Sequence, residues 1–254
     1  MRYCMVIDLD KCIGCQTCAV ICKMHHAQPQ GTWWNRVFTQ GSDYHQSAVG
    51  TKDGFKIEYL PVSCQMCDNA PCERVCPTGA TYKNEEGMIL VDYDRCIGCR
   101  TCMAACPYGV RQFNWKDPKK AKEEAGYAYG YPFDVTEKGK RLVYTQDRPA
   151  GVVEKCTFCV ECMNADGTYD ALPACVRACP GKARYFGDLD DPKSEVSRLV
   201  SSKQVFRLKE EYGTEPKVYY ISSTKSKNVE GPWTEQSWEN KTPNTIIPVV
   251  SSDL

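Results

Sequence analysis

Sixteen of the eighteen cysteines in this 254-residue chain fall into four groups whose spacing is typical of iron–sulfur ligands. A C-x2-C-x2-C run places three thiolates around one tight turn, near enough to bind three irons of one cubane. A fourth cysteine that follows after three residues and precedes a proline binds the other cluster of a pair. The four groups are Cys12, Cys15, Cys18 and Cys22; Cys64, Cys67, Cys72 and Cys76; Cys96, Cys99, Cys102 and Cys106; and Cys156, Cys159, Cys175 and Cys179.

The third group, which ends Cys106-Pro107, fits this pattern fully, whereas Lys23 replaces the proline after Cys22. Groups two and three are close in the sequence and can form one two-cluster unit, so groups one and four must pair across the chain. The crossover of the fourth cysteine then predicts four ligand sets. They are the Cys12 set (Cys12, Cys15, Cys18 with Cys179), the Cys156 set (Cys156, Cys159, Cys175 with Cys22), the Cys64 set (Cys64, Cys67, Cys72 with Cys106) and the Cys96 set (Cys96, Cys99, Cys102 with Cys76).

We expect each set to bind one [4Fe–4S] cluster, which gives four clusters as the cofactors of the chain. Structural zinc is the first alternative, but zinc sites use pairs of C-x2-C without a fourth cysteine at this spacing. A disulfide framework is the second, but cysteines three residues apart rarely bridge without strain. No nucleophile–base constellation is present, so we expect no catalytic residue in the chain.

Cys4 and Cys162 are left over. Cys4 stands in a strand-like run, and we expect it to be a core residue. Cys162 makes a further C-x2-C-x2-C run and could replace Cys175 as a ligand. However, Pro173-Ala174-Cys175 mirrors Ala70-Pro71-Cys72, which favours a free buried thiol at position 162.

An internal repeat predicts the elements that position the cysteines. The residues from Asp8 to Cys18 match those from Asp92 to Cys102 at an offset of 84, and groups two and four also match. We predict an α+β fold of two ferredoxin-like units related by a pseudo-twofold repeat, with an inserted hairpin or loop and an extended C-terminal arm. The predicted division is 1–60 with 151–190 for the first unit, 61–114 for the second, 115–150 for the insertion, and 191–254 for a C-terminal extension and partner-binding arm.

Short elements are expected around the cysteine groups. Met5–Ile7 and Met88–Val91 have the composition of strands, and Ala19–Ile21 suits one or two helical turns after the third cysteine of its group. Residues 191–211 carry a weak helical pattern, and the last residues of the chain have no periodicity.

The composition limits the functions that this chain can have. The net charge is zero and charged residues make up 25% of the chain, so nothing suggests nucleic-acid binding. Met1-Arg2-Tyr3-Cys4 leads directly into a cysteine motif, so we expect no signal peptide. No apolar stretch approaches the length of a membrane span, so we expect a membrane link to come only through a partner.

The order of the four groups, with group two as C-x2-C-x4-C-x3-C-P, resembles the iron–sulfur subunit of the dimethyl-sulfoxide-reductase family of molybdenum or tungsten enzymes. The resemblance covers residues 3–186, including Cys67-Asp68-Asn69-Ala70-Pro71-Cys72 and Cys106-Pro107-Tyr108-Gly109-Val110. Nitrate-reductase relatives have tryptophan at the position of Cys99 and hold a [3Fe–4S] centre, so Cys99 favours four cubanes. The stretch 213–220 is similar to tails in the polysulfide-, thiosulfate- and arsenate-reductase branch and in the transhydroxylase small subunit.

This resemblance implies an electron-transfer subunit in a complex with a large molybdopterin or tungstopterin catalytic subunit. Its second partner would be a membrane anchor subunit or a soluble electron carrier. The alternatives are the small subunit of a transhydroxylase-type complex and the beta subunit of a formate dehydrogenase or hydrogenase. The resemblance favours the periplasmic face, reached by co-export with a partner that has a twin-arginine signal, over a cytoplasmic site.

Several other residues have two interpretations each. Five cations beside ligands could raise cluster potentials or serve only solubility: Lys11, Arg95, Arg100, Lys155 and Arg177. His25, His26 and His45 are expected to be surface or loop residues rather than ligands. Trp233 and Trp238 lie in the C-terminal arm, where we expect them to anchor the chain on its large partner.

Overall fold

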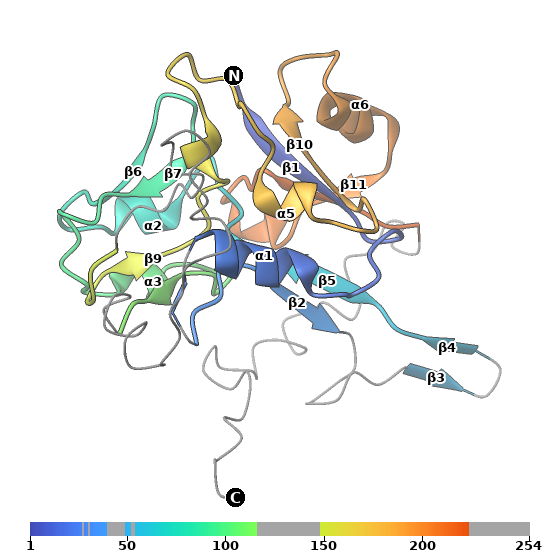
Figure 1. Cartoon of the computed structure of the whole chain (residues 1–254), viewed down its shortest axis with the longest axis horizontal. Coiled ribbons are helices and arrows are strands. Elements are labelled where there is room, and N and C mark those ends of the chain that lie inside the picture. Colours follow the sequence, from blue (N-terminus) through green and yellow to red (C-terminus); the bar gives the residue numbers. More distant parts are fainter. Residues whose placement is uncertain (27, 30, 40–48, 52–53, 116–147, 224–254) are drawn as a thin grey trace, which may run out of the picture.

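The largest sheet is organised around the N-terminal strand β1 (Tyr3–Asp8), whose side chains are buried on both faces. The computed structural model describes residues 1–26, 28–29, 31–39, 49–51, 54–115 and 148–223 (Figure 1). β1 pairs antiparallel with β10 (Arg184–Asp188) and parallel with β12 (Val218–Ile221). The edge strand β11 (Val205–Phe206) pairs antiparallel with β12, which gives the order β10-β1-β12-β11.

Side chains on the two faces of β1 belong to two different apolar clusters. Met5 and Ile7 point into the main core, whereas Cys4 and Val6 pack with Val196 of helix α6 (Glu195–Ser202). The side chain of Ser194 caps this helix by accepting a hydrogen bond from the Ser197 backbone. Cys4 is therefore the core residue that the sequence predicted. The helical pattern over 191–211 is realised only in α6, after which the chain turns into β11.

The strands explain which cysteine groups meet. β1 ends shortly before Cys12 and β10 begins shortly after Cys179, so their antiparallel pairing brings groups one and four together. The hairpin of β6 (Thr81–Lys83) and β7 (Ile89–Val91) links groups two and three in the same way. Figure 1 shows this hairpin on one side of the molecule and the four-stranded sheet with α6 on the other. The predicted strands at both places are confirmed.

Each cysteine group also carries a short helix that begins near its third cysteine. These helices are α1 (Thr17–His25), α2 (Pro71–Arg74), α3 (Thr101–Ala104) and α5 (Ala174–Arg177). Two 3-10 turns, η1 (Val160–Cys162) and η2 (Glu210–Tyr212), complete the helical elements of the described residues. Helix α1 has nine residues, so it is slightly longer than the one or two helical turns that the sequence predicted there. This mixture of short helices and strands confirms the α+β class.

The remaining strands form two-stranded pairs. They are β2 (Arg36–Thr39) with β5 (Tyr59–Val62), β3 (Val49–Thr51) with β4 (Gly54–Lys56), and β8 (Gln112–Phe113) with β9 (Val153–Glu154). β8 and β9 hold the two ends of the predicted insertion side by side, and the backbone N–H of Gly151 donates to the Asn114 carbonyl at 2.7 Å. Residues 116–147 of that insertion lie outside the described residues.

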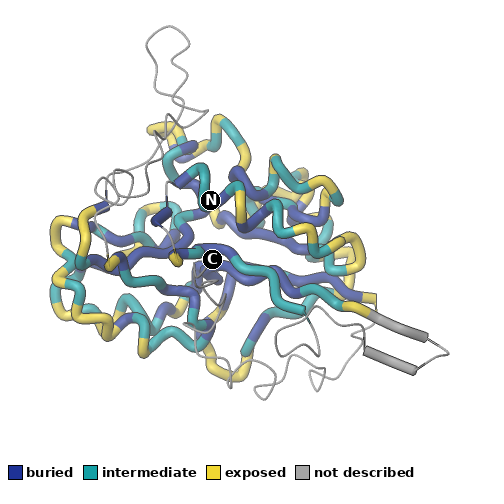
Figure 2. The backbone as a smooth tube through the Cα atoms, turned by 60° about the horizontal axis from the view of Figure 1, so that its bottom comes forward, coloured by how far each residue is buried: buried dark blue, intermediate teal, exposed yellow. Residues whose placement is uncertain are grey.

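The first part of the predicted C-terminal extension belongs to the body of the protein. Residues 205–221 supply two strands of the largest sheet, and Tyr220 is fully buried. Figure 2 shows buried backbone through the middle of the molecule and exposed segments around its edge. The prediction of an arm therefore concerns residues 224–254, which lie outside the described residues together with Trp233 and Trp238. Among the helices of the described residues, none has both the length and the apolar character needed to cross a bilayer.

A matched pair of glycines tests how tightly the cysteine turns are packed. Gly98 and Gly109 both have a positive φ, of 69° and 59°. A Cβ on Gly98 would overlap the carbonyl oxygen of Gly151, whereas a Cβ on Gly109 would meet nothing within 4 Å. Both alanine variants lose about 1–2 kcal/mol from the left-handed backbone. We expect Gly98→Ala to lower Tm further than Gly109→Ala; equal losses would show that the Gly151 loop adjusts freely.

Candidate metal centres

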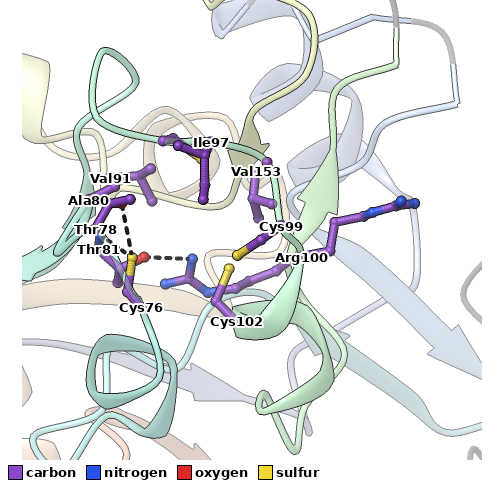
Figure 3. Close-up of a pocket in the computed structure, with 13 residues that line it drawn as sticks. Cys76, Thr78, Ala80, Thr81, Val91, Ile97, Cys99, Arg100, Cys102 and Val153 are labelled. Atoms are coloured by element: carbon purple, nitrogen blue, oxygen red, sulfur yellow. Dashed lines mark hydrogen bonds between the residues drawn. The ribbon is translucent and has the colours of Figure 1, made fainter.

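None of the eighteen cysteines forms a disulfide, and sixteen of them lie together in four groups of four with the membership that the sequence predicted. The Cys12 and Cys96 sets each line one cavity with all four of their cysteines. In Figure 3, Cys76 approaches its cavity from one side and Cys99 and Cys102 from the other. The Cys64 set is brought together around Cys67. The pKa of Cys67 is raised to about 12 by burial and by the neighbouring thiols of Cys64, Cys106 and Cys72. Cys159 likewise has Cys175, Cys22 and Cys156 as close neighbours.

The four sets differ in their access to solvent. Cys15 and Cys99 are exposed, and the isoleucines that stand two residues before them, Ile13 and Ile97, are 61% and 66% exposed. By contrast, Cys64, Cys67, Cys156 and Cys159 are buried. The Cys12 and Cys96 sets therefore lie at the surface, and the Cys64 and Cys156 sets lie inside.

Electrostatic interactions between thiols of different sets place the sets in a row. The thiols of Cys18 and Cys175 interact across the boundary of the Cys12 and Cys156 sets. Cys64 acts on Cys156 between the two buried sets, and Cys72 acts on Cys102 between the Cys64 and Cys96 sets. The order is thus the Cys12, Cys156, Cys64 and Cys96 sets, with an exposed set at each end.

The chemistry of these sets fits cubane clusters. Burial, followed by the charges of Cys64 and Cys175, raises the pKa of Cys156 to about 12, so bare thiols would stay protonated there at neutral pH. A bound metal makes such thiols ionise, because only the thiolate is a ligand. Beside the Cys96 cavity, Nε and Nη2 of buried Arg111 have no nitrogen or oxygen acceptor among the described residues, and their N–H groups suit cluster sulfur. Four thiols and these N–H donors around one cavity match a [4Fe–4S] cluster.

In the Cys156 set, each cysteine sulfur also lies within hydrogen-bonding distance of one nitrogen atom. Gln28 Nε2 donates to Cys22 Sγ at 3.3 Å, and the Phe158 backbone N–H donates to Cys156 Sγ at 3.4 Å. His26 Nε2 lies 3.5 Å from Cys159 Sγ, and Arg184 Nη1 lies 3.8 Å from Cys175 Sγ. Hydrogen bonds to cluster sulfurs are one of the means by which a protein sets the reduction potential.

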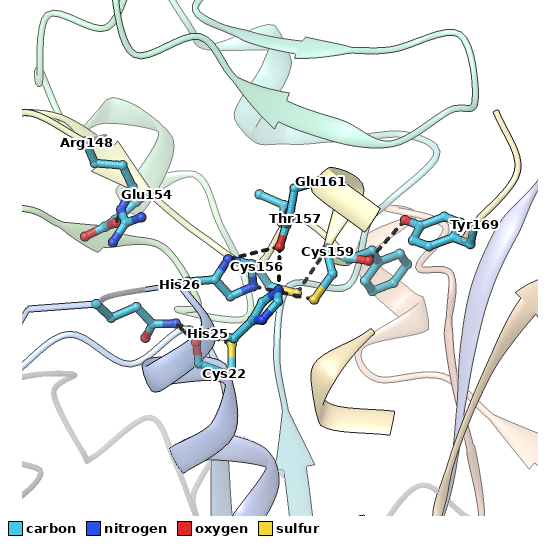
Figure 4. A network of polar contacts seen from close by, with 12 residues as sticks. Cys22, His25, His26, Arg148, Glu154, Cys156, Thr157, Cys159, Glu161 and Tyr169 are labelled. Carbon is cyan, nitrogen blue, oxygen red and sulfur yellow. Dashed lines mark hydrogen bonds and ion pairs between the residues drawn. The ribbon is translucent and has the colours of Figure 1, made fainter. Parts of the chain in front are cut away.

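Two histidines near this set correct a sequence expectation. His26 lies in the turn after α1, but it is not at the surface, because only 4% of it is exposed. Its Nδ1 lies 3.3 Å from Glu161 Oε1, and the same oxygen accepts from His25 Nε2 at 3.2 Å (Figure 4). The chain Cys159–His26–Glu161–His25 therefore connects a cysteine of the Cys156 set to a carboxylate. His45 lies outside the described residues.

Cys162 does not join the Cys156 set. It is buried in η1 against Cys159 and Ala174, but the charges that act on it come from Glu161, Arg177 and Asp170 rather than from other thiols. Cys175 occupies the fourth corner of the set instead. This placement agrees with the expectation of a free buried thiol at position 162.

Of the five cations that the sequence placed beside ligands, only Lys155 is buried; Lys11, Arg95, Arg100 and Arg177 are exposed. The sequence reasoning missed two buried arginines, Arg111 and Arg184, that lie against the cysteines. Each follows a Cys-Pro pair by the same spacing, in Cys106-Pro107 to Arg111 and in Cys179-Pro180 to Arg184. That shared C-P-x-x-x-R pattern was the signal that could have identified them.

Comparison with known proteins agrees with this geometry. A 4Fe–4S dicluster domain matches residues 55–127, and a second 4Fe–4S dicluster domain family matches residues 11–80 and 95–165. The fold and the cysteine sets thus define a multi-cluster 4Fe–4S protein, and two dicluster domains correspond to four [4Fe–4S] clusters.

Full-length relatives narrow the class. The chain is 44% identical to a Halobacterium salinarum protein assigned as the iron–sulfur subunit of a dimethyl sulfoxide reductase, over 94% of this chain and 86% of the relative. It is 41% identical to the arsenate respiratory reductase iron–sulfur subunit of a Shewanella species, over 88% and 97%. It is 40% identical to the iron–sulfur cluster-binding subunit of menaquinone reductase from Nitratidesulfovibrio vulgaris, over 87% and 89%. This chain belongs to the family of iron–sulfur subunits of dimethyl-sulfoxide-reductase-type oxidoreductases.

The placement of Cys162 and Cys175 gives a paired prediction. Cys162→Ala should retain the iron content and electron paramagnetic resonance (EPR) spectrum of the wild-type protein, since the charges that act on Cys162 come from Glu161, Arg177 and Asp170 and not from the thiols of the Cys156 set. Cys175→Ala should lose or alter one cluster, because it removes one of four converging thiols. Iron analysis and EPR of both anaerobically purified variants check this, and a cluster lost only in Cys162→Ala would reverse the assignment.

Proposed function

We propose that this chain relays electrons through four [4Fe–4S] clusters between a molybdopterin or tungstopterin catalytic subunit and a membrane or soluble redox partner. The observation that carries this proposal is the row of four cysteine sets with an exposed set at each end. Such a row provides one surface where electrons enter and another where they leave. The sixteen cysteines of the four sets are the proposed ligands, in the pairing that the spacing predicted.

The electron-transfer role is that of the family, and the choice of partners follows from the relatives. Several relatives are named as components of reductases for dimethyl sulfoxide, selenate, arsenate or polysulfide. A catalytic subunit of that type would supply the substrate chemistry, and this chain would supply only conduction. Export to the periplasmic face with a twin-arginine partner is the localisation that we propose on the same ground.

The ends of the row are suited to contact with partners. Ile13 and Ile97 present apolar surface directly over the Cys12 and Cys96 sets. Burial of these side chains in two different interfaces would exclude water and bring each terminal cluster close to an external redox centre. We propose that the two partners bind at these two ends.

A transhydroxylase-type complex is the alternative, because there the clusters need not change oxidation state during turnover. The complex that contains this chain can be purified without oxygen and reduced with the reduced form of methyl viologen. It is then mixed with arsenate, selenate or dimethyl sulfoxide in separate experiments. We expect about sixteen irons and sixteen sulfides per chain. We also expect one of the oxidants to reoxidise the clusters on the timescale of turnover, which freeze-quench EPR would detect. Clusters that keep their oxidation state while product forms would favour the alternative.

Cys99→Trp tests the assignment of the exposed Cys96 set. Three cysteines of the set remain, so we expect conversion of that one centre to [3Fe–4S], with a new EPR signal in the oxidised protein. The exposed position of Cys99 leaves room for the larger side chain. A folded variant with full iron content and no new signal would contradict the assignment.

A further inference from the structure

A buried cation lies at each of the three junctions between neighbouring cysteine sets. Arg184 lies between the Cys12 and Cys156 sets, Lys155 between the Cys156 and Cys64 sets, and Arg111 between the Cys64 and Cys96 sets. The exposed fractions of these residues are 4%, 1% and 2%. Within the described part of the chain, none of the three forms an ion pair with a carboxylate.

Arg184 reaches both sets that it separates. It lines the cavity of the Cys12 set, and Cys18 is the thiol that acts on it most strongly. Its Nη1 lies 3.8 Å from Cys175 Sγ in the Cys156 set. Its Nη2 donates to Asn35 Oδ1 at 3.1 Å, which fixes the orientation of the guanidinium.

Arg111 occupies the corresponding place in the other half of the row. It lines the cavity of the Cys96 set with Cys102, and Cys72 of the Cys64 set is the thiol that acts on it most strongly. Its Nη1 donates to Thr81 Oγ1 at 3.1 Å, while Nε and Nη2 have no nitrogen or oxygen acceptor among the described residues. The guanidinium group interacts instead with the thiols of Cys72 and Cys102, one from each neighbouring set.

Lys155 closes the central junction. Its Nζ donates to the carbonyl oxygens of Cys156, at 2.9 Å, and of Ile89, and it contacts Met66 Sδ at 3.8 Å. Met66 stands between Cys64 and Cys67, so the ammonium group touches the loops of both buried sets.

The absence of carboxylate partners in the described residues decides the role of these cations. Burial of an unpaired charge is strongly unfavourable. Arg184 Nη1 lies 3.8 Å from Cys175 Sγ and the residue also lines the cavity of the Cys12 set, while Arg111 lines the cavity of the Cys96 set. The negative charges available to these two guanidinium groups are therefore those of the neighbouring cysteine sets when they bind clusters.

We infer that Arg184, Lys155 and Arg111 are shared counter-ions, each of which raises the reduction potentials of the two clusters between which it lies. This inference rests on the proposed four-cluster relay. A cluster with four thiolates is negative and gains a further negative charge on reduction, so a nearby buried cation stabilises the reduced state. Because each cation is shared, it stabilises an electron on either neighbour, and the transfer between them leaves that interaction nearly unchanged.

The test uses EPR-monitored redox titration of the anaerobically purified complex that contains this chain. Arg184→Met should lower the midpoint potentials of two clusters, and Arg111→Met should lower those of the other two. Lys155→Met should lower one potential from each of these pairs. The charge-retaining variants Arg184→Lys, Arg111→Lys and Lys155→Arg should give markedly smaller shifts.

Arg95→Gln is the matched control, because Arg95 is an exposed arginine directly beside Cys96 and its charge is screened by solvent. It should leave all four potentials unchanged. If the methionine variant at Arg111 or Arg184 loses iron, the glutamine variant at that position is compared with the lysine variant instead. Glutamine keeps a hydrogen-bond donor but lacks the charge.

Two failures are distinguishable. A wild-type complex without four reducible clusters would overturn the proposed relay. Four intact clusters whose potentials do not respond to removal of the buried charges, or respond equally to Arg95→Gln, would overturn only the role of the cations.

Discussion

The structure depends on one constraint: four thiols from two separate segments must meet at each of four points. Each set takes three cysteines from one group and one from a partner group, so no group can complete a site alone. The antiparallel pairing of β1 with β10 brings groups one and four into range, and the β6–β7 hairpin does the same for groups two and three. The short helices then place the third cysteine of each group, with the fourth following closely in sequence.

This convergence concentrates negative charge inside a small protein, and the surroundings of each set reflect that. The exposed Cys15 and Cys99 have their pKa values lowered chiefly by hydrogen bonds with Thr17 and Thr101, and water completes their environment. The buried sets have no such access and rely on fixed donors and cations from the protein. Most of the buried cysteines therefore belong to the main apolar core, into which Arg184, Lys155 and Arg111 bring positive charge, whereas the apolar cluster between β1 and α6 contains none of the sixteen cysteines.

The features that depend on the spacing of cysteines and on local patterns of apolar residues could be predicted from the sequence. The four ligand sets, the strands beside groups one and three and the burial of Cys4 all follow from local patterns. The parallel pairing of β1 with β12 could not be predicted, because its partners lie more than two hundred residues apart and leave no local signature. Burial of Arg111 and Arg184 was missed because a buried arginine and an exposed one look alike without their neighbours. His26 was missed because α1 continues to His25 and carries the next residue into the interior.

The pairing of β12 with β1 has a consequence for the order in which the protein folds and acquires its clusters during synthesis. Cysteines for the Cys64 and Cys96 sets are all present once residue 106 has emerged, whereas the Cys156 set waits for residue 175 and the Cys12 set for residue 179. The central sheet is complete only when Val218–Ile221 has been synthesised. Because domains fold as units from the N-terminus during synthesis, one half of the row can acquire its iron while the N-terminal cysteines remain open. Those early thiols need protection from oxygen and from stray metals until the final strand arrives.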